Sequence, residues 1–218
     1  GIGDIFLRRA DGSGVAQPLV TGPKSEGVYH WSRSANTLVY VVQDIGNDGG
    51  DIWYKLIDKD RPQGTVVKTP STEFPGSISP DGKYIVYTSN ETGQFEVYVT
   101  RFPTGEGKWP ISVNGGFSPQ WSEQSSEIFY VGPDQTMMVV PVEPHSTFQV
   151  PLPKSLFSAD GVGVVFSNRP VGGPVIHSYT VTSDGQRFVM VQYLEGENQA
   201  SPTITLVQDW AAKFAGQE

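Results

Sequence analysis

The sequence contains no cysteine, which excludes disulfide bonds, thiolate nucleophiles and zinc sites built on cysteine. Basic residues are also few, with 15 Lys and Arg against 23 Asp and Glu and a formal net charge of −8. Nucleic acids and anionic membrane surfaces are bound through clustered Lys and Arg, and the sequence shows no basic run or stripe. We therefore expect neither of them as a partner.

Long apolar runs and familiar catalytic motifs are missing as well. No stretch approaches the ~20 apolar residues of a membrane-spanning helix, and residues 1–10 lack the pattern of a signal peptide, so we expect no direct membrane insertion. The sequence has no Gly-x-Ser-x-Gly nucleophile elbow, no kinase phosphate loop and no His-Arg-Asp catalytic loop. Its scattered Ser, His and Asp residues do not define a catalytic triad.

Turn-forming residues, by contrast, are abundant. The 218 residues include 25 Gly and 17 Pro, and no long helical period is visible among them. This composition predicts many short strands joined by turns, and hence an all-β fold.

One turn, followed by an apolar strand, occurs four times in the sequence. In its clearest copy, Ser79-Pro80-Asp81-Gly82 is followed by the apolar segment 84–87. Proline presets the first corner of a type I turn, Asp closes the turn with its side chain, and Gly ends it without Cβ strain. The anchor residues of the four copies are Ser32, Ser79, Ser122 and Thr182. They stand 47, 43 and 60 residues apart, and the first two spacings are typical of four-stranded propeller blades.

The strand after each anchor carries apolar residues at matching positions. Six residues after the anchors stand Leu38, Ile85, Ile128 and Phe188, and eight residues after them stand Tyr40, Tyr87, Tyr130 and Met190. Neighbouring residues of a strand point to opposite faces, and the residues between these positions are apolar too. Strands that are apolar on both faces predict antiparallel blades stacked face to face, with aromatic side chains packed between them.

The repeat divides the chain into blade-sized units. We expect a half blade over 3–20, full blades over 28–69, 74–114 and 117–157, an insertion loop over 158–174, a last blade over 175–209 and a terminal helix or tail over 210–218. The first unit reads as the last two strands of a blade, so its sheet would have an open edge that invites pairing with another strand.

These motifs resemble a known family. The Trp31-Ser32 and Ser79-Pro80-Asp81-Gly82 turns and the third strand Asp51-Ile52-Trp53-Tyr54 resemble the WD-like repeats of TolB-type β-propellers. The segment 204–210 is similar to the end of the propeller domains that form the C-terminal, extracytoplasmic part of many bacterial membrane-anchored Ser/Thr protein kinases. The resemblance implies a partial propeller, with four to five visible blades of six, in the periplasm or outside the cell. Any kinase domain would lie outside this sequence.

An acidic, glycine-rich hairpin is the candidate metal site. Asp44, Asp48 and Asp51 lie within eight residues, and calcium binds such hard oxygen ligands on flexible loops. The spacing departs from an EF-hand, because Gly46 replaces the second acidic ligand and Lys55 the final Glu. A turn that binds nothing is the alternative. Apart from this possible calcium, no cofactor is expected.

Residues at the start of the inner strands are candidates for the mouth of the central channel. The candidate ligand-binding residues are Tyr29, His30, Glu73, Phe74, Gln120 and His177. An aromatic and acidic rim would suit a peptide, a sugar or a cationic small molecule. Ordinary packing between blades is the alternative explanation for the same residues.

Three functions fit these observations. The first is a non-catalytic module that binds a protein, a peptide or a small ligand. The second is a metal-dependent propeller enzyme, such as a lactonase or a glycoside-type hydrolase, with His30 and His177 at the channel. The third is an accessory propeller that controls access to a peptidase domain, as in the prolyl oligopeptidase type.

Overall fold

The computed structural model describes residues 3–43, 50–57, 63–124, 126–142, 149–164, 166, 179–192 and 203–207, the last five by their backbone. Three sheets of four antiparallel strands lie in the middle of the chain. They consist of β3 (Ser25–Ser32), β4 (Thr37–Gln43), β5 (Gly50–Leu56) and β6 (Gln63–Val67); β7 (Glu73–Ile78), β8 (Tyr84–Ser89), β9 (Glu96–Arg101) and β10 (Trp109–Pro110); and β11 (Phe117–Trp121), β12 (Glu127–Val131), β13 (Thr136–Pro141) and β14 (Lys154–Ser158).

Smaller sheets stand at the two ends. The first contains β1 (Ile5–Leu7) and β2 (Gln17–Val20), and the last contains β15 (Tyr179–Val181), β16 (Phe188–Gln192) and β17 (Thr203–Val207). The segment 158–174, expected as a loop, includes the short helix α1 (Ala159–Val162), which the Ser158 side chain caps. The terminal segment 210–218 lies outside the described residues. In the described part of the chain, no helix has the length and apolar character of a membrane span.

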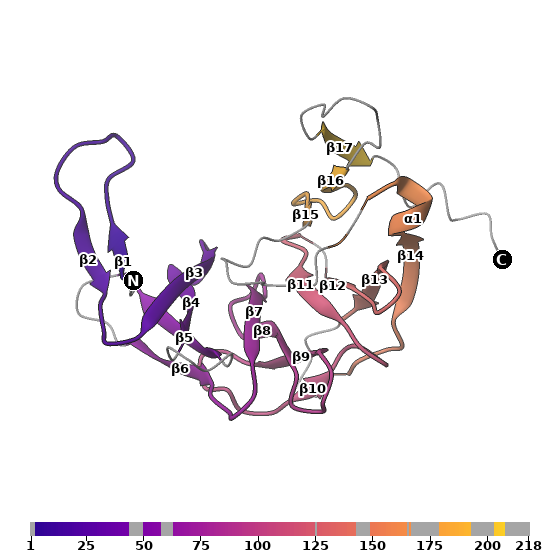
Figure 1. Ribbon diagram of the computed structural model, residues 1–218, viewed down its shortest axis with the longest axis horizontal. Coiled ribbons are helices and arrows are strands. Elements are labelled where there is room, and N and C mark those ends of the chain that lie inside the picture. Colours follow the sequence, from indigo (N-terminus) through magenta and orange to yellow (C-terminus); the bar gives the residue numbers. More distant parts are fainter. Residues whose placement is uncertain are drawn as a thin grey trace.

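The sheets follow one another along an arc, as the blades of a propeller do (Figure 1). In each sheet the strands are ordered as in the sequence, and β3, β7, β11 and β15 lie toward the centre of the arc. The last strands β6, β10 and β14 lie toward its outside. The fold is therefore a partial β-propeller of antiparallel blades, which confirms the all-β prediction.

The recurrent turn is held by its anchor hydroxyl. Ser79 Oγ donates a hydrogen bond of 2.6 Å to Asp81 Oδ1 and accepts one of 3.0 Å from the backbone N–H of Tyr84. Gly82 closes the turn with a positive φ of 74°, where a side chain would be strained. Thr182 and Asp184 form the same pair in the last blade. A hydroxyl suits the anchor position because the same side chain donates a hydrogen bond to the Asp of the turn and accepts one from a backbone N–H.

The second strand of each blade supplies the seams between blades. Leu38, Ile85, Ile128 and Phe188 are buried in four successive core clusters, together with Tyr40, Tyr87, Tyr130 and Met190. The residues between them face the next blade: Val39 packs with Ile85, Val86 with Ile128, and Phe129 with Phe188. The rings of Phe129 and Phe188 meet edge to face at 5.1 Å. The second strands β4, β8 and β12 are thus each shared by two seams.

Glu73 is a charged residue buried at the seam between the second and third blades. Its Oε1 accepts hydrogen bonds from Thr69 and, at 3.3 Å, from Ser89. Its Oε2 is buried and has no hydrogen-bond partner within the described part of the chain. Desolvation raises the pKa of this carboxyl above its usual range, although the two hydroxyl donors partly offset it.

Truncating a seam residue should destabilise the fold strongly. We expect Ile85→Ala to lower the free energy of unfolding by ~2–5 kcal/mol, because a fully buried side chain is lost and a cavity remains. Val113→Ala, at an exposed position, should change it by less than ~0.5 kcal/mol. Urea denaturation measures both, and equal small losses would contradict the assignment of the seam.

Replacing Glu73 should change how stability depends on pH. Because its pKa is higher in the folded state, the wild-type protein loses stability as the pH rises from the unfolded value through the folded one. Glu73→Gln removes this loss, so the stability of the variant relative to the wild type should increase as the pH rises above about 4.3, the ordinary pKa of Glu. The exposed Glu106→Gln is the control and should follow the wild type. A Glu73→Gln difference that does not vary with pH would contradict a raised pKa.

Candidate functional site at the inner strands

A single repeat position lines the centre of the propeller with polar side chains. Two residues before the four anchors stand His30, Ser77, Gln120 and Thr180, one on each inner strand. The register shifts at or just before this position in three inner strands: between Val28 and His30 in β3, between Pro75 and Ile78 in β7, and between Phe117 and Gln120 in β11. A β-bulge of this kind redirects the following side chains, and here it recurs in three blades.

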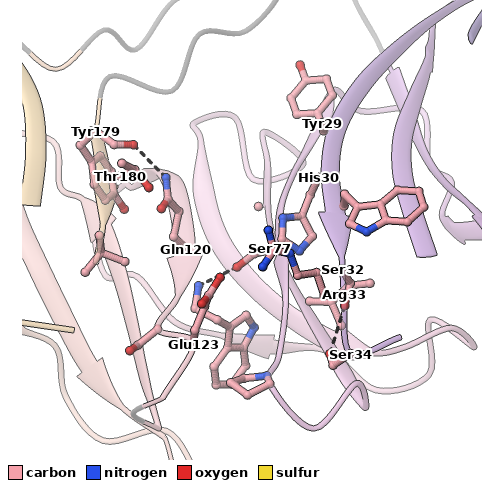
Figure 2. Close-up of a pocket in the computed structure, with 17 residues that line it drawn as sticks. Tyr29, His30, Ser32, Arg33, Ser34, Ser77, Gln120, Glu123, Tyr179 and Thr180 are labelled. Atoms are coloured by element: carbon pink, nitrogen blue, oxygen red, sulfur yellow. Dashed lines mark hydrogen bonds between the residues drawn. The ribbon is translucent and has the colours of Figure 1, made fainter. Parts of the chain in front are cut away.

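These strands line an open cavity of about 610 Å³. It is lined by the inner strands and their turns: 29–34 from β3, 76–78 and Pro80 from β7, 120–123 from β11, and 179–181 from β15. Figure 2 shows Gln120 and Tyr179 on one side of this space and His30, Ser32 and Arg33 on the other. Its volume lies in the range of small-molecule sites.

Hydrogen bonds between blades fix the walls of the cavity. The side chain of Ser77 accepts a hydrogen bond of 2.7 Å from the backbone N–H of Trp121, which joins β7 to β11. Gln120 donates one of 2.9 Å to the carbonyl of Tyr179, and the Tyr179 hydroxyl donates one of 2.8 Å to the carbonyl of Ser118. Burial raises the pKa of Tyr179, so its hydroxyl stays protonated as a donor.

The strands approach each other closely at the centre. A Cβ added to Gly76 would lie 2.2 Å from the carbonyl oxygen of Pro119 on β11, so only glycine fits there. Beyond this contact, the turns after β3 and β11 carry Arg33 and Glu123, both exposed at the cavity. The site therefore offers hydroxyl, amide and imidazole groups in the centre and charges of both signs at its edge.

The structure brings some of the predicted ligand-binding residues together. Tyr29, His30 and Gln120 line the cavity, and burial raises the pKa of the Tyr29 hydroxyl. Glu73 and Phe74 lie at the start of β7, outside the lining. Phe74 nevertheless stacks on Tyr29, with ring centroids 6.5 Å apart. His177 lies outside the described residues.

Several lining residues were not singled out from the sequence, although a signal for them exists. Ser77 and Thr180 follow from counting two residues back from each anchor, as His30 and Gln120 do. Arg33 and Glu123 both directly follow an anchor serine. Counting from the anchors would therefore have located Ser77, Thr180, Arg33 and Glu123. The choice of residues near the start of each inner strand selected Glu73 and Phe74 instead.

The candidate calcium loop is only partly visible. Asp51 lies on β5, and its carboxylate forms an ion pair of 3.2 Å with Lys68. Asp44 and Asp48 lie outside the described residues, so calcium binding by this loop remains a prediction. Among the residues whose positions are described, no group of three or more His, Cys, Asp or Glu side chains could hold a metal ion.

Comparisons with known proteins identify the fold. No protein-family model and no curated protein sequence matches the chain. TolB from Acinetobacter baumannii is similar over 92% of this chain and 45% of its own, with 14% identity and a TM-score of 0.61. A putative TolB from Agrobacterium tumefaciens is similar over 71% and 57%, with 20% identity and a TM-score of 0.52. An oligogalacturonate lyase in complex with manganese is similar over 89% and 51%, with 15% identity and a TM-score of 0.58.

The chain spans about half the length of these three proteins. At such low identity the likeness concerns the fold alone, and a lyase shares it with TolB. The repeat, the stacked antiparallel sheets and these structural relatives together show that the chain has a TolB-like β-propeller fold.

Proposed function

We propose that this chain is a non-catalytic propeller module that binds a peptide, a protein segment or a small ligand in its inner-strand cavity. The observation that carries the proposal is the set of polar side chains at one repeat position, which four inner strands direct to a common space. Hydrogen bonds between blades hold two of these side chains, Ser77 and Gln120, in place before any ligand arrives. Such preorganisation lowers the entropic cost of binding.

The lining favours recognition by hydrogen bonds. Ser77, Gln120 and Thr180 are neutral groups, and Arg33 and Glu123 add opposite charges at the edge. Tyr29 contributes aromatic surface, which sugars and peptide side chains contact readily. This mixture is typical of a binding site with few polar groups on a rigid frame.

A propeller hydrolase or lyase is the second candidate. His30 in the cavity favours it, because imidazole is both a common metal ligand and a general base. The proposed binding role and this alternative share the same cavity, and an assay for turnover separates them.

We also propose that the module works in the periplasm or outside the cell. The resemblance of its closing segment to extracytoplasmic propeller domains supports this location.

Blocking the cavity should abolish ligand binding. We would screen short peptides, oligosaccharides and cationic small molecules by ligand-observed NMR, and then repeat the positive tests with Thr180→Trp. Thr180 is exposed in the cavity, so the indole should fill it and weaken binding at least about tenfold.

Leu152→Trp, at an exposed position outside the cavity, is the matched control and should bind like the wild type. If no compound binds, or if Thr180→Trp binds as well as the control, the proposed site is wrong. Turnover of a ligand that Thr180→Trp prevents would favour the enzyme.

A further inference from the structure

The first sheet has an unpaired inner edge. β1 pairs with β2 just as β5 pairs with β6, since Ile5 lies opposite Val20 and Ile52 opposite Val67. The sequence Asp4-Ile5-Phe6 also matches Asp51-Ile52-Trp53. β1 is therefore the third strand of its blade. In the described part of the chain no strand pairs with its other edge, the place that β4 takes beside β5.

Among the residues that the structure describes, β1 and β2 cover one part of the neighbouring sheet's face. Its face toward β1 and β2 carries Leu38 and Tyr40, which are buried with Ile5 and Val20. Val28 and Trp31 of β3 belong to the same face, since Val28 pairs with Tyr40 and Trp31 with Leu38, and paired residues of antiparallel strands point to the same side of a sheet. This part of the face lies nearer the centre of the propeller (Figure 1). Val28 is 62% exposed and Trp31 is 41% exposed.

The other blades show what this region of the face requires. Trp31, Ile78 and Trp121 each stand directly before an anchor. Ile78 and Trp121 are only 5% exposed, because the inner half of the preceding blade covers them. The third strands show a similar trend, since Leu7 is 41% exposed whereas its counterparts in the next two blades, Tyr54 and Val99, are partly and fully buried. Two strands are absent from this place in the described structure.

We propose that the inner edge of β1 and the Val28–Trp31 part of β3 bind a β-hairpin from outside these 218 residues. One strand of the hairpin pairs antiparallel with β1, and the other lies beside it toward the centre of the propeller. The backbone N–H and C=O groups of an open edge give such strand addition its affinity, and alternate apolar side chains give it specificity.

The repeat also defines the chemistry of the occupant. The strand next to β1 must present an apolar side chain to Trp31, as Val39 does to Ile78 and Val86 to Trp121. A second copy of this chain fits less well. Its β1 and β2 contain three and four residues and include Pro18, whereas the complete blades place inner strands of five to eight residues here.

The test supplies a hairpin of known fit. Residues 73–90 of the same chain form an inner and a second strand in their own blade, so a copy of them can be fused ahead of Gly1 through a flexible linker of about ten residues. Hydrogen exchange of the Ile5, Phe6 and Leu7 amides should slow at least about tenfold relative to the unfused chain, because β1 becomes an internal strand.

A matched control fusion carries Asp in place of Val86 in the added copy only. In this fusion the amides of β1 should exchange hydrogen as fast as in the unfused chain. Trp31→Ala in the first fusion should abolish most of the protection. Equal protection in both fusions, or none in either, would overturn the proposal. So would a dimer of the unfused chain, detected by analytical ultracentrifugation, that Trp31→Ala dissociates, because a second copy would then occupy the surface.

Discussion

The structure depends on the burial of one strand between two neighbours. In β4, β8 and β12 the residues six and eight positions after the anchor face the preceding blade, and the residue between them faces the following blade. Burying a large aliphatic or aromatic side chain in this way contributes ~1.5–3 kcal/mol, and each seam contains several of them. No sheet can bury both of its faces alone, so each blade needs a blade on either side. This requirement arranges the sheets along an arc and turns their first strands to its centre (Figure 1).

The cavity is a consequence of that arrangement. Because the seams fix the angle between blades, equivalent residues of the inner strands come together although more than forty residues separate them in sequence. The bulge before this position then aims His30 and Gln120 at the centre and lets Trp121 pack into a seam. Thus the residue at this one position of the repeat can differ between blades without disturbing the packing of the seams that support the cavity.

Much of the fold could be predicted from the sequence, because the turn and the apolar strand repeat in a fixed register. The fate of individual residues was harder to predict, since it depends on neighbours that the repeat does not specify. Trp31 and Trp121 occupy the same repeat position, yet one is exposed and the other is buried. Glu73 is the first residue of an inner strand and was therefore expected at the rim of the channel, but it is buried, and its side chain accepts a hydrogen bond from Thr69. The bulges also reverse the strand alternation, so side-chain direction near the cavity could not be obtained by counting alone.

A double-mutant cycle across one seam tests the central claim most directly. Val39 and Ile85 belong to the same seam, whereas Val39 and Ile128 belong to different ones. The account predicts that Val39→Ala and Ile85→Ala, measured by urea denaturation, are coupled by at least ~0.5 kcal/mol, while Val39→Ala and Ile128→Ala add independently. Independent effects for Val39 and Ile85, or equal coupling in both pairs, would contradict stacked blades with separate seams.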